Sequence, residues 1–79
     1  MPKNIPSLKP RELVRLLEKG GCSFFREGKG DHSIYIRTFG NQKRVVPIDM
    51  GVRELSPPYV LRIFRQFGFT DDEIEHLLK

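Results

Sequence analysis

The sequence contains very little cysteine and no long apolar run. Cys22 is the only cysteine, so no internal disulfide can form and the metal sites built on paired cysteines are excluded. A reducing compartment is the simplest setting for such a chain. No apolar run approaches the roughly 20 residues that cross a membrane, and residues 1–6 lack the apolar region of a signal peptide. We therefore expect a cytoplasmic protein with no membrane association.

Acidic residues are also scarce over most of the chain. Residues 1–69 hold 13 Lys and Arg against 6 Asp and Glu, whereas residues 70–79 hold 1 and 4. A basic body attracts polyanions, and an acidic tail is repelled by them. At 79 residues the chain is long enough for one domain only, residues 1–79. Its core is small, so binding to a partner should stabilise it.

Residue patterns in the first half predict one helix and three strands. Ser7 is expected to cap a helix that has Pro10 in its first turn and ends at Gly20-Gly21. The buried stripe of this helix is expected to consist of Leu13, Leu16 and Leu17. Three β-rich segments follow at residues 22–27, 32–38 and 42–48, and glycine-containing turns separate them at residues 28–31 and 39–41.

The second half predicts two more helices. Ser56 and Pro57 open a helix before Gly68, and its apolar residues repeat with helical spacing at Val60, Ile63, Phe64 and Phe67. Residues 70–73, Thr-Asp-Asp-Glu, match a capping box at the start of a short C-terminal helix. The fold class is therefore α+β, an α-β-β-β-α order with a three-stranded antiparallel sheet, helices on one face and a short C-terminal helix.

The alternation of the second strand indicates which side chains share a face. Ile34 and Ile36 have the same parity as His32, so we expect all three on the core-facing side, with His32 at the rim of the sheet. Five of the six phenylalanines are expected to be core residues rather than a platform for stacking bases, and these five are Phe24, Phe25, Phe64, Phe67 and Phe69.

His32 is the strongest candidate for chemistry. Gly28 and Gly30 form a turn that delivers it to the first position of a strand. Histidine has the unperturbed pKa nearest neutrality, so a positioned imidazole can accept or donate a proton at cellular pH. Cations surround it in sequence, at Arg26, Lys29, Arg37, Lys43 and Arg44. A lone proton-transfer group among positive charges suits a phosphodiester and predicts a small ribonuclease.

These residues resemble the HicA family of bacterial toxins over nearly the whole chain. The opening helix at residues 8–21, the Gly28 to His32 motif with Tyr35 after it, and the helix and its exit at residues 60–70 follow the family's order and spacing. The chain departs from many members in having Asp31 and Ser33 beside the histidine and residues 48–50, Ile-Asp-Met, after Val46-Pro47. His32 is thus the sole histidine near the motif, and a second proton-transfer group stays unassigned.

The resemblance implies an mRNA interferase with a fold like that of double-stranded-RNA-binding domains. It implies that His32 is the catalytic residue, that mRNA is the substrate and that a HicB-type antitoxin binds the chain as a hetero-oligomer and covers His32. Cleavage is expected to need no metal or other cofactor, because the 2′-hydroxyl of RNA is the nucleophile and a histidine can remove its proton. No binding of DNA by the chain alone is expected.

Five residues are candidates for contact with RNA. Arg26 and Lys29 are the cations nearest to His32 in sequence, Lys43 and Arg44 lie on the neighbouring strand, and Tyr35 is the aromatic near enough to stack on a base. His76 has no motif around it and is expected to be a solvated helix residue.

Two other function classes remain open. A non-catalytic RNA-binding module would share the element order and the basic body, but such modules carry a lysine cluster at the start of their last helix, where this chain has residues 56–59, Ser-Pro-Pro-Tyr. A protein-interaction domain would use the same charge to bind an acidic partner. Cleavage of single-stranded RNA separates the nuclease from both.

Overall fold

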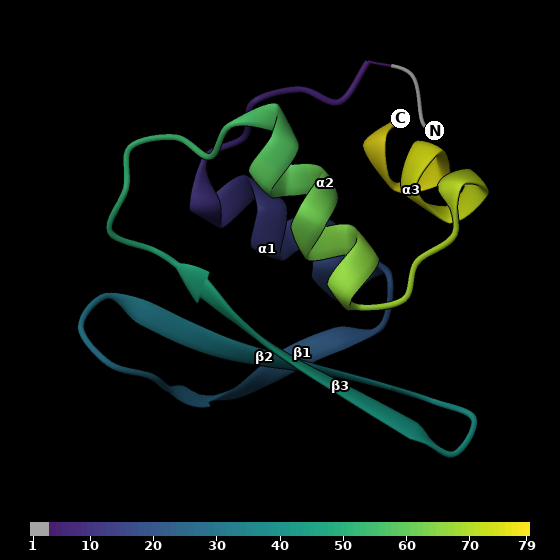
Figure 1. Cartoon of the computed structure of the whole chain (residues 1–79), viewed down its shortest axis with the longest axis horizontal. Helices are drawn as coiled ribbons and strands as arrows, with labels where there is room; N and C mark the ends of the chain where they lie inside the picture. Colours follow the sequence, from purple (N-terminus) through teal and green to yellow (C-terminus); the bar gives the residue numbers. More distant parts are fainter. Residues whose placement is uncertain (1–3) are drawn as a thin grey trace.

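The computed structural model describes residues 4–79. The expectation that residues 1–6 are not part of a signal peptide therefore falls partly on residues 1–3, which lie outside the described residues. Three strands form an antiparallel sheet in the order β1-β2-β3. The helices gather on one side of it, and no described element covers the other face (Figure 1). The expected α+β order is confirmed, and its elements are α1 (Pro10–Lys19), β1 (Cys22–Glu27), β2 (His32–Phe39), β3 (Gln42–Asp49), α2 (Pro57–Gln66) and α3 (Asp71–Leu78).

The helix starts show how local chemistry sets two of the three boundaries. Ser56 precedes α2 with Pro57 at its first position, as expected. The capping box of α3 is formed, since Thr70 Oγ1 accepts from the Glu73 backbone N–H at 3.2 Å and Glu73 Oε1 accepts from the Thr70 backbone N–H at 2.8 Å. These contacts satisfy backbone donors that a helix amino end leaves free.

The start of α1 differs from the expectation. The residue before the helix is Lys9, whose backbone N–H donates to Glu12 Oε1 at 2.9 Å, and Ser7 is not the cap. The reason is a tertiary contact, because Leu8 and Leu55 exchange backbone hydrogen bonds of 3.1 and 2.7 Å. That bridge keeps the chain extended through Leu8, so the helix begins later, at Pro10.

The prediction that His32, Ile34 and Ile36 lie on the core-facing side of the sheet was wrong. The buried sheet residues are Cys22, Tyr35, Val46 and Ile48, and Tyr35 pairs with Val46 across the β2–β3 ladder. Because side chains alternate along a strand, Ile34 and Ile36 lie on the opposite, outer face, where Ile36 pairs with the half-exposed Val45. Both faces of β2 carry apolar side chains, so alternation alone does not reveal which face the helices cover.

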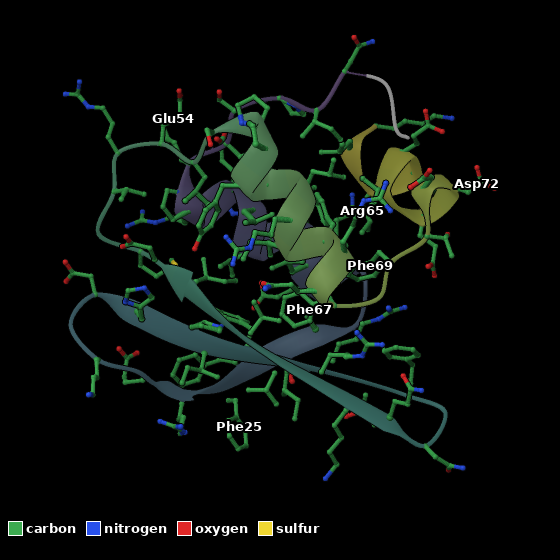
Figure 2. All side chains as sticks on the ribbon, in the orientation of Figure 1. Phe25, Glu54, Arg65, Phe67, Phe69 and Asp72 are labelled. Carbon is green, nitrogen blue, oxygen red and sulfur yellow. The ribbon has the colours of Figure 1, made fainter. Side chains whose placement is uncertain are left out.

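The helices supply most of the core. Phe64, Phe67 and Val60 of the α2 segment are fully buried, as the spacing predicted. In α1 the stripe is Leu13, Val14 and Leu17, and Leu16 is only partly buried. Phe24 and Phe25 are about half exposed, contrary to the expectation of core positions. β1 is an edge strand with a bulge at Phe25, and this side chain stands on the sheet face away from the helices (Figure 2).

Arg37 joins the sheet to the exit of α2. Its Nη1 donates to the Phe67 carbonyl at 2.9 Å, and its guanidinium carbon lies 3.9 Å from the centre of the Phe69 ring and 4.4 Å from that of Phe39. Arg37 Nη2 also forms an ion pair with Glu73 Oε2 of α3 at 3.5 Å. Only 11% of the Arg37 side chain is exposed. This arginine is therefore a structural cation that ties together three parts of the chain.

Candidate active site

The turn between β1 and β2 fixes the backbone of His32. The Gly28 N–H donates to the His32 carbonyl at 2.8 Å, and the His32 N–H donates to the Lys29 carbonyl at 3.1 Å. Gly30 has a φ of +58°, a left-handed conformation that costs glycine little. The turn-forming roles expected for Gly28 and Gly30 fit this geometry.

Gly28 also leaves room for the histidine. A Cβ atom at this position would lie 3.2 Å from His32 Cβ, 3.3 Å from the His32 carbonyl oxygen and 3.4 Å from Ile34 Cδ1. These separations are at the short limit of van der Waals contact, so any side chain here would push on His32. The glycine therefore has a packing reason in addition to its place in the turn.

The imidazole ring is oriented by the same turn. His32 Nδ1 lies 3.2 Å from the Lys29 carbonyl oxygen. A carbonyl oxygen only accepts, so this contact assigns the proton to Nδ1 and leaves the lone pair of the neutral ring on Nε2. The ring is partly exposed, and His32 belongs to the outer face of the sheet by its parity with Ile34 and Ile36. Nε2 is thus the atom available for proton transfer.

The segment after β3 packs beside this turn. The Met50 N–H donates to the Asp31 carbonyl at 2.9 Å, and the Asp31 side chain lies against Gly51 so closely that a Cβ at Gly51 would collide with it. Asp49 is the register partner of His32, and its Oδ1 accepts from the Gly51 N–H at 2.9 Å. The packing of this segment beside His32 was not predicted from the sequence, although Asp49 two residues before Gly51 is a turn signal.

Two of the candidate cations lie near His32. Arg26 pairs with Ile34, which follows His32 by two residues, so Arg26 is a diagonal neighbour on the same face, about 7–8 Å away and within reach of a long side chain. The Arg26 guanidinium donates to the Glu27 carbonyl at 3.3 Å. Lys29 contributes the carbonyl that holds the ring, and its side chain is exposed.

The structure separates the other two candidate cations from His32. Lys43 pairs with Thr38, six residues along β2, which corresponds to about 20 Å at the usual rise of a strand. Arg44 is at the same end, where its Nη1 donates to the Gln66 carbonyl at 3.3 Å. Arg44 thereby contacts the end of α2, a place where helix carbonyls attract cations.

Tyr35 is a core residue. It is 7% exposed, lies on the face of β2 opposite to His32 by parity, and contacts the Phe24 ring edge to face at 5.7 Å between centres. Burial raises the pKa of its hydroxyl, and the charges of Glu18 and Glu27 add to the rise. This position does not bring Tyr35 next to His32 for stacking on a base.

Three further observations concern the described residues as a whole. Among residues 4–79, no three His, Cys, Asp or Glu side chains are grouped so that they could hold a metal ion. No helix in the same range is long and apolar enough to cross a lipid bilayer. His76, the other histidine, lies exposed on α3, far along the chain from the turn.

Comparison with known protein families identifies a match. The family described as HicA toxin of bacterial toxin-antitoxin matches residues 10–69, from the start of α1 to the exit of α2. A search of curated proteins finds none that matches the chain. The matched range includes the β1–β2 turn, His32 and the β3 exit. The chain therefore belongs to the HicA family, the toxins of bacterial toxin–antitoxin systems.

Proposed function

We propose that the chain is a toxin that cleaves mRNA in the cytoplasm, with His32 as the proton-transfer group and without a metal ion. The observation that carries the proposal is the contact between His32 Nδ1 and the Lys29 carbonyl, which directs the lone pair to Nε2 on a partly exposed ring. A ring held in one tautomer is ready to remove a proton, and one such group contributes roughly 10²–10⁴ in rate.

The reaction follows from the chemistry of RNA. His32 Nε2 removes the proton of a 2′-hydroxyl, and the 2′-oxygen then attacks the adjacent phosphorus. The bond from phosphorus to the 5′-oxygen breaks, and this oxygen takes a proton from water. The products are a 2′,3′-cyclic phosphate and a 5′-hydroxyl end. No nucleophile from the protein is needed.

Positive charge supports the same step. The non-bridging oxygens of the phosphate bear extra negative charge in the transition state, and donors aimed at that charge lower the barrier. Arg26 is the diagonal neighbour of His32 on the same sheet face, and Lys29 is part of the turn that holds the ring. We assign phosphate contact near the scissile bond to these two residues. Lys43 and Arg44 would contact RNA about 20 Å away, at the other end of the sheet.

Membership of a toxin–antitoxin family implies an antitoxin partner. We propose that the partner is of the HicB type and that it covers His32. Acidic side chains of an inhibitor would be steered toward Arg26 and Lys29, and the same contact would exclude RNA. Inhibition is then competitive with RNA, and the complex melts at a higher temperature than the free toxin, by an amount that rises with antitoxin concentration.

The test of the nuclease compares the purified chain with His32→Ala and His76→Ala. Single-stranded RNA is incubated with each protein, and initial cleavage rates are measured. We expect His32→Ala to reduce the rate at least 100-fold, with its thermal unfolding little changed because the ring lies at a partly exposed rim. His76→Ala is the matched control and should cleave at the parent rate. Equal rates for the parent and His32→Ala would refute the proposal.

The test of occlusion uses the complex with the antitoxin. Diethyl pyrocarbonate modifies exposed imidazoles, so the modification of His32 is followed by mass spectrometry in the free toxin and in the complex, with His76 as the internal reference. Protection of His32 together with loss of cleavage is expected. A tight complex in which His32 is still modified and RNA is still cut would contradict occlusion.

A further inference from the structure

A hollow lined by four cations lies between the start of α1 and the segment after β3. Lys9, Arg11 and Arg15 come from the first helix and the residue before it, and Arg53 comes from the segment between β3 and α2. The hollow has a volume of about 570 Å³. We call these four residues the basic hollow. Their charges converge on one place although Arg15 and Arg53 are far apart in the sequence.

The charge of the basic hollow is not neutralised within the described residues. Among residues 4–79 the ion pairs are Arg37–Glu73 and Arg65–Asp71, and neither includes a cation of the hollow. Glu12 is the acidic residue in the lining, but its Oε1 accepts from the Lys9 backbone N–H. The four cations and Glu12 together leave the lining with a net charge of +3. A concave surface with an excess of charge of one sign concentrates the potential and attracts ions of the opposite sign.

The basic hollow is next to the turn that carries His32. Met50 lines the hollow and donates its N–H to the Asp31 carbonyl, one residue before His32. Gly51 lies directly against the Asp31 side chain. Figure 1 shows the β1–β2 turn, the segment after β3 and the start of α1 together at the left of the molecule, with the β2–β3 turn and α3 at the right. A strand of RNA with one phosphate at His32 can therefore extend into the hollow.

We propose that the basic hollow binds the sugar–phosphate backbone of the RNA strand beside the nucleotide at His32. The inference rests on the proposed nuclease function and adds a binding site that extends the substrate beyond the scissile bond. Three of the four cations are arginines, whose planar guanidinium forms paired hydrogen bonds with phosphate oxygens. Arg11 and Arg15 are four residues apart and so share one face of α1, which presents two such groups in a row.

Three arginines outside the basic hollow have contacts that account for them. Arg44 contacts the carbonyl of Gln66 at the end of α2, Arg65 pairs with Asp71, and Arg37 is fixed by Phe67 and Glu73. The four cations of the basic hollow form no ion pair with an acidic group among residues 4–79. Protein interfaces usually have an apolar centre, whereas the basic hollow is lined mainly by cations. We therefore choose RNA, a polyanion, over an acidic protein as its ligand.

The experiment measures binding of labelled single-stranded RNA to protein that carries His32→Ala, so that no cleavage interferes. One variant adds Arg15→Gln and Arg53→Gln in the hollow. The matched control adds Arg62→Gln and Lys79→Gln, which remove the same charge from exposed positions outside the hollow and outside the site. Dissociation constants are measured over a range of salt concentrations. Because both variants have the same net charge, general electrostatic attraction weakens equally in each.

Removal of each phosphate contact should lower the salt slope by about 0.7 for single-stranded RNA. If parent and variant bind equally well at about 1 M salt, each removed contact makes the variant bind about fivefold more weakly than the parent at about 0.1 M salt. The hollow variant should therefore bind about 25-fold more weakly than its His32→Ala parent, with a slope lower by about 1.4. The control should bind within about twofold of the parent.

Three results would overturn the inference. The first is equal affinity and equal salt slope for the hollow variant and the control, and the second is no RNA binding by the parent at low salt. The third is unchanged RNA affinity with weakened binding of the antitoxin, which would make the hollow a protein-docking surface. If the protein with His32 intact does not cleave RNA, the proposed function fails, and the binding comparison still decides the role of the hollow.

Discussion

Replacing Arg37 should destabilise the fold more than replacing any exposed cation. In Arg37→Met the side chain keeps most of its length but has no charge and no donors. The Phe67 carbonyl, which accepts from Arg37 at 2.9 Å, is left without this partner, and a hydrogen bond from a charged group contributes about 1.5–3 kcal/mol. The interactions with the Phe69 and Phe39 rings add about 1 kcal/mol.

The ion pair with Glu73 adds little, because that carboxyl is 47% exposed and such pairs contribute up to about 1 kcal/mol. The methionine restores some apolar packing, so we expect a destabilisation of about 3 kcal/mol. A chain of this length has a free energy of unfolding of about 4–12 kcal/mol. The destabilisation should lower the melting temperature by about 12–24 °C.

The assay is urea denaturation of the parent, Arg37→Met and the control Arg62→Ala, with the unfolding midpoint and slope fitted for each. Arg62 is exposed on α2, so the control should change the free energy of unfolding by no more than about 0.5 kcal/mol. Arg37→Met should shift the midpoint at constant slope. A destabilisation below about 1 kcal/mol, similar to the control, would refute the structural role of Arg37.

The remaining predictions concern the turn, a helix cap and the thiol. Gly28→Ala should slow RNA cleavage by about tenfold or more, because it displaces the His32 side chain, while urea denaturation shows a change below about 1 kcal/mol; unchanged kinetics would contradict the packing argument. The Thr70 backbone N–H donates to the Glu73 carboxyl and holds its pKa below the usual value. The ionised carboxyl therefore stabilises the fold at pH values above its pKa in the unfolded state. This contribution is lost as the pH falls through the pKa of Glu73 in the folded state. The stability difference between the parent and Glu73→Gln should shrink from about pH 5.5 to about pH 3, and a constant difference would count against it. Burial raises the pKa of the Cys22 thiol to about 11, although Arg37 opposes the rise; a maleimide should label it slowly in the native protein and rapidly in urea, and rapid native labelling would contradict this.

Features set by neighbouring residues could be predicted from the sequence. The start of α2 depends on Ser56-Pro57, and the start of α3 depends on the capping box formed by Thr70 and Glu73. Each of these signals lies within four consecutive residues. The two-residue turn before Gln42 and the glycine turn before His32 are local in the same way. The order of elements follows from these boundaries, which is why the α+β class was predictable.

Features set by distant contacts could not be predicted. The Leu8–Leu55 bridge moves the N-cap of α1 from Ser7 to Lys9. The choice of Tyr35 rather than Ile34 as a core residue depends on where the helices dock, and β2 is apolar on both faces. Arg37 resembles a surface cation in the sequence because its acceptor is 30 residues away.

The candidate site shows the same division. The β1–β2 turn and His32 were found because glycine and histidine are close together in the motif. The contact of Nδ1 with the Lys29 carbonyl and the convergence of Arg15 and Arg53 needed coordinates. Lys43 and Arg44 are near His32 in the sequence but lie at the opposite end of a strand pair, because the β2–β3 hairpin folds them back beside Thr38 and Arg37.

The measurement that tests the central claim most directly is the chemistry of the RNA ends left by the purified toxin in EDTA. A base at His32 acting on the 2′-hydroxyl predicts cleavage that persists in EDTA, with 2′,3′-cyclic phosphate and 5′-hydroxyl ends, and no such products from His32→Ala. An RNA with a 2′-deoxy nucleotide at the cleaved position should resist cleavage there. Loss of activity in EDTA, or 5′-phosphate and 3′-hydroxyl ends as metal-activated water would produce, would contradict the account.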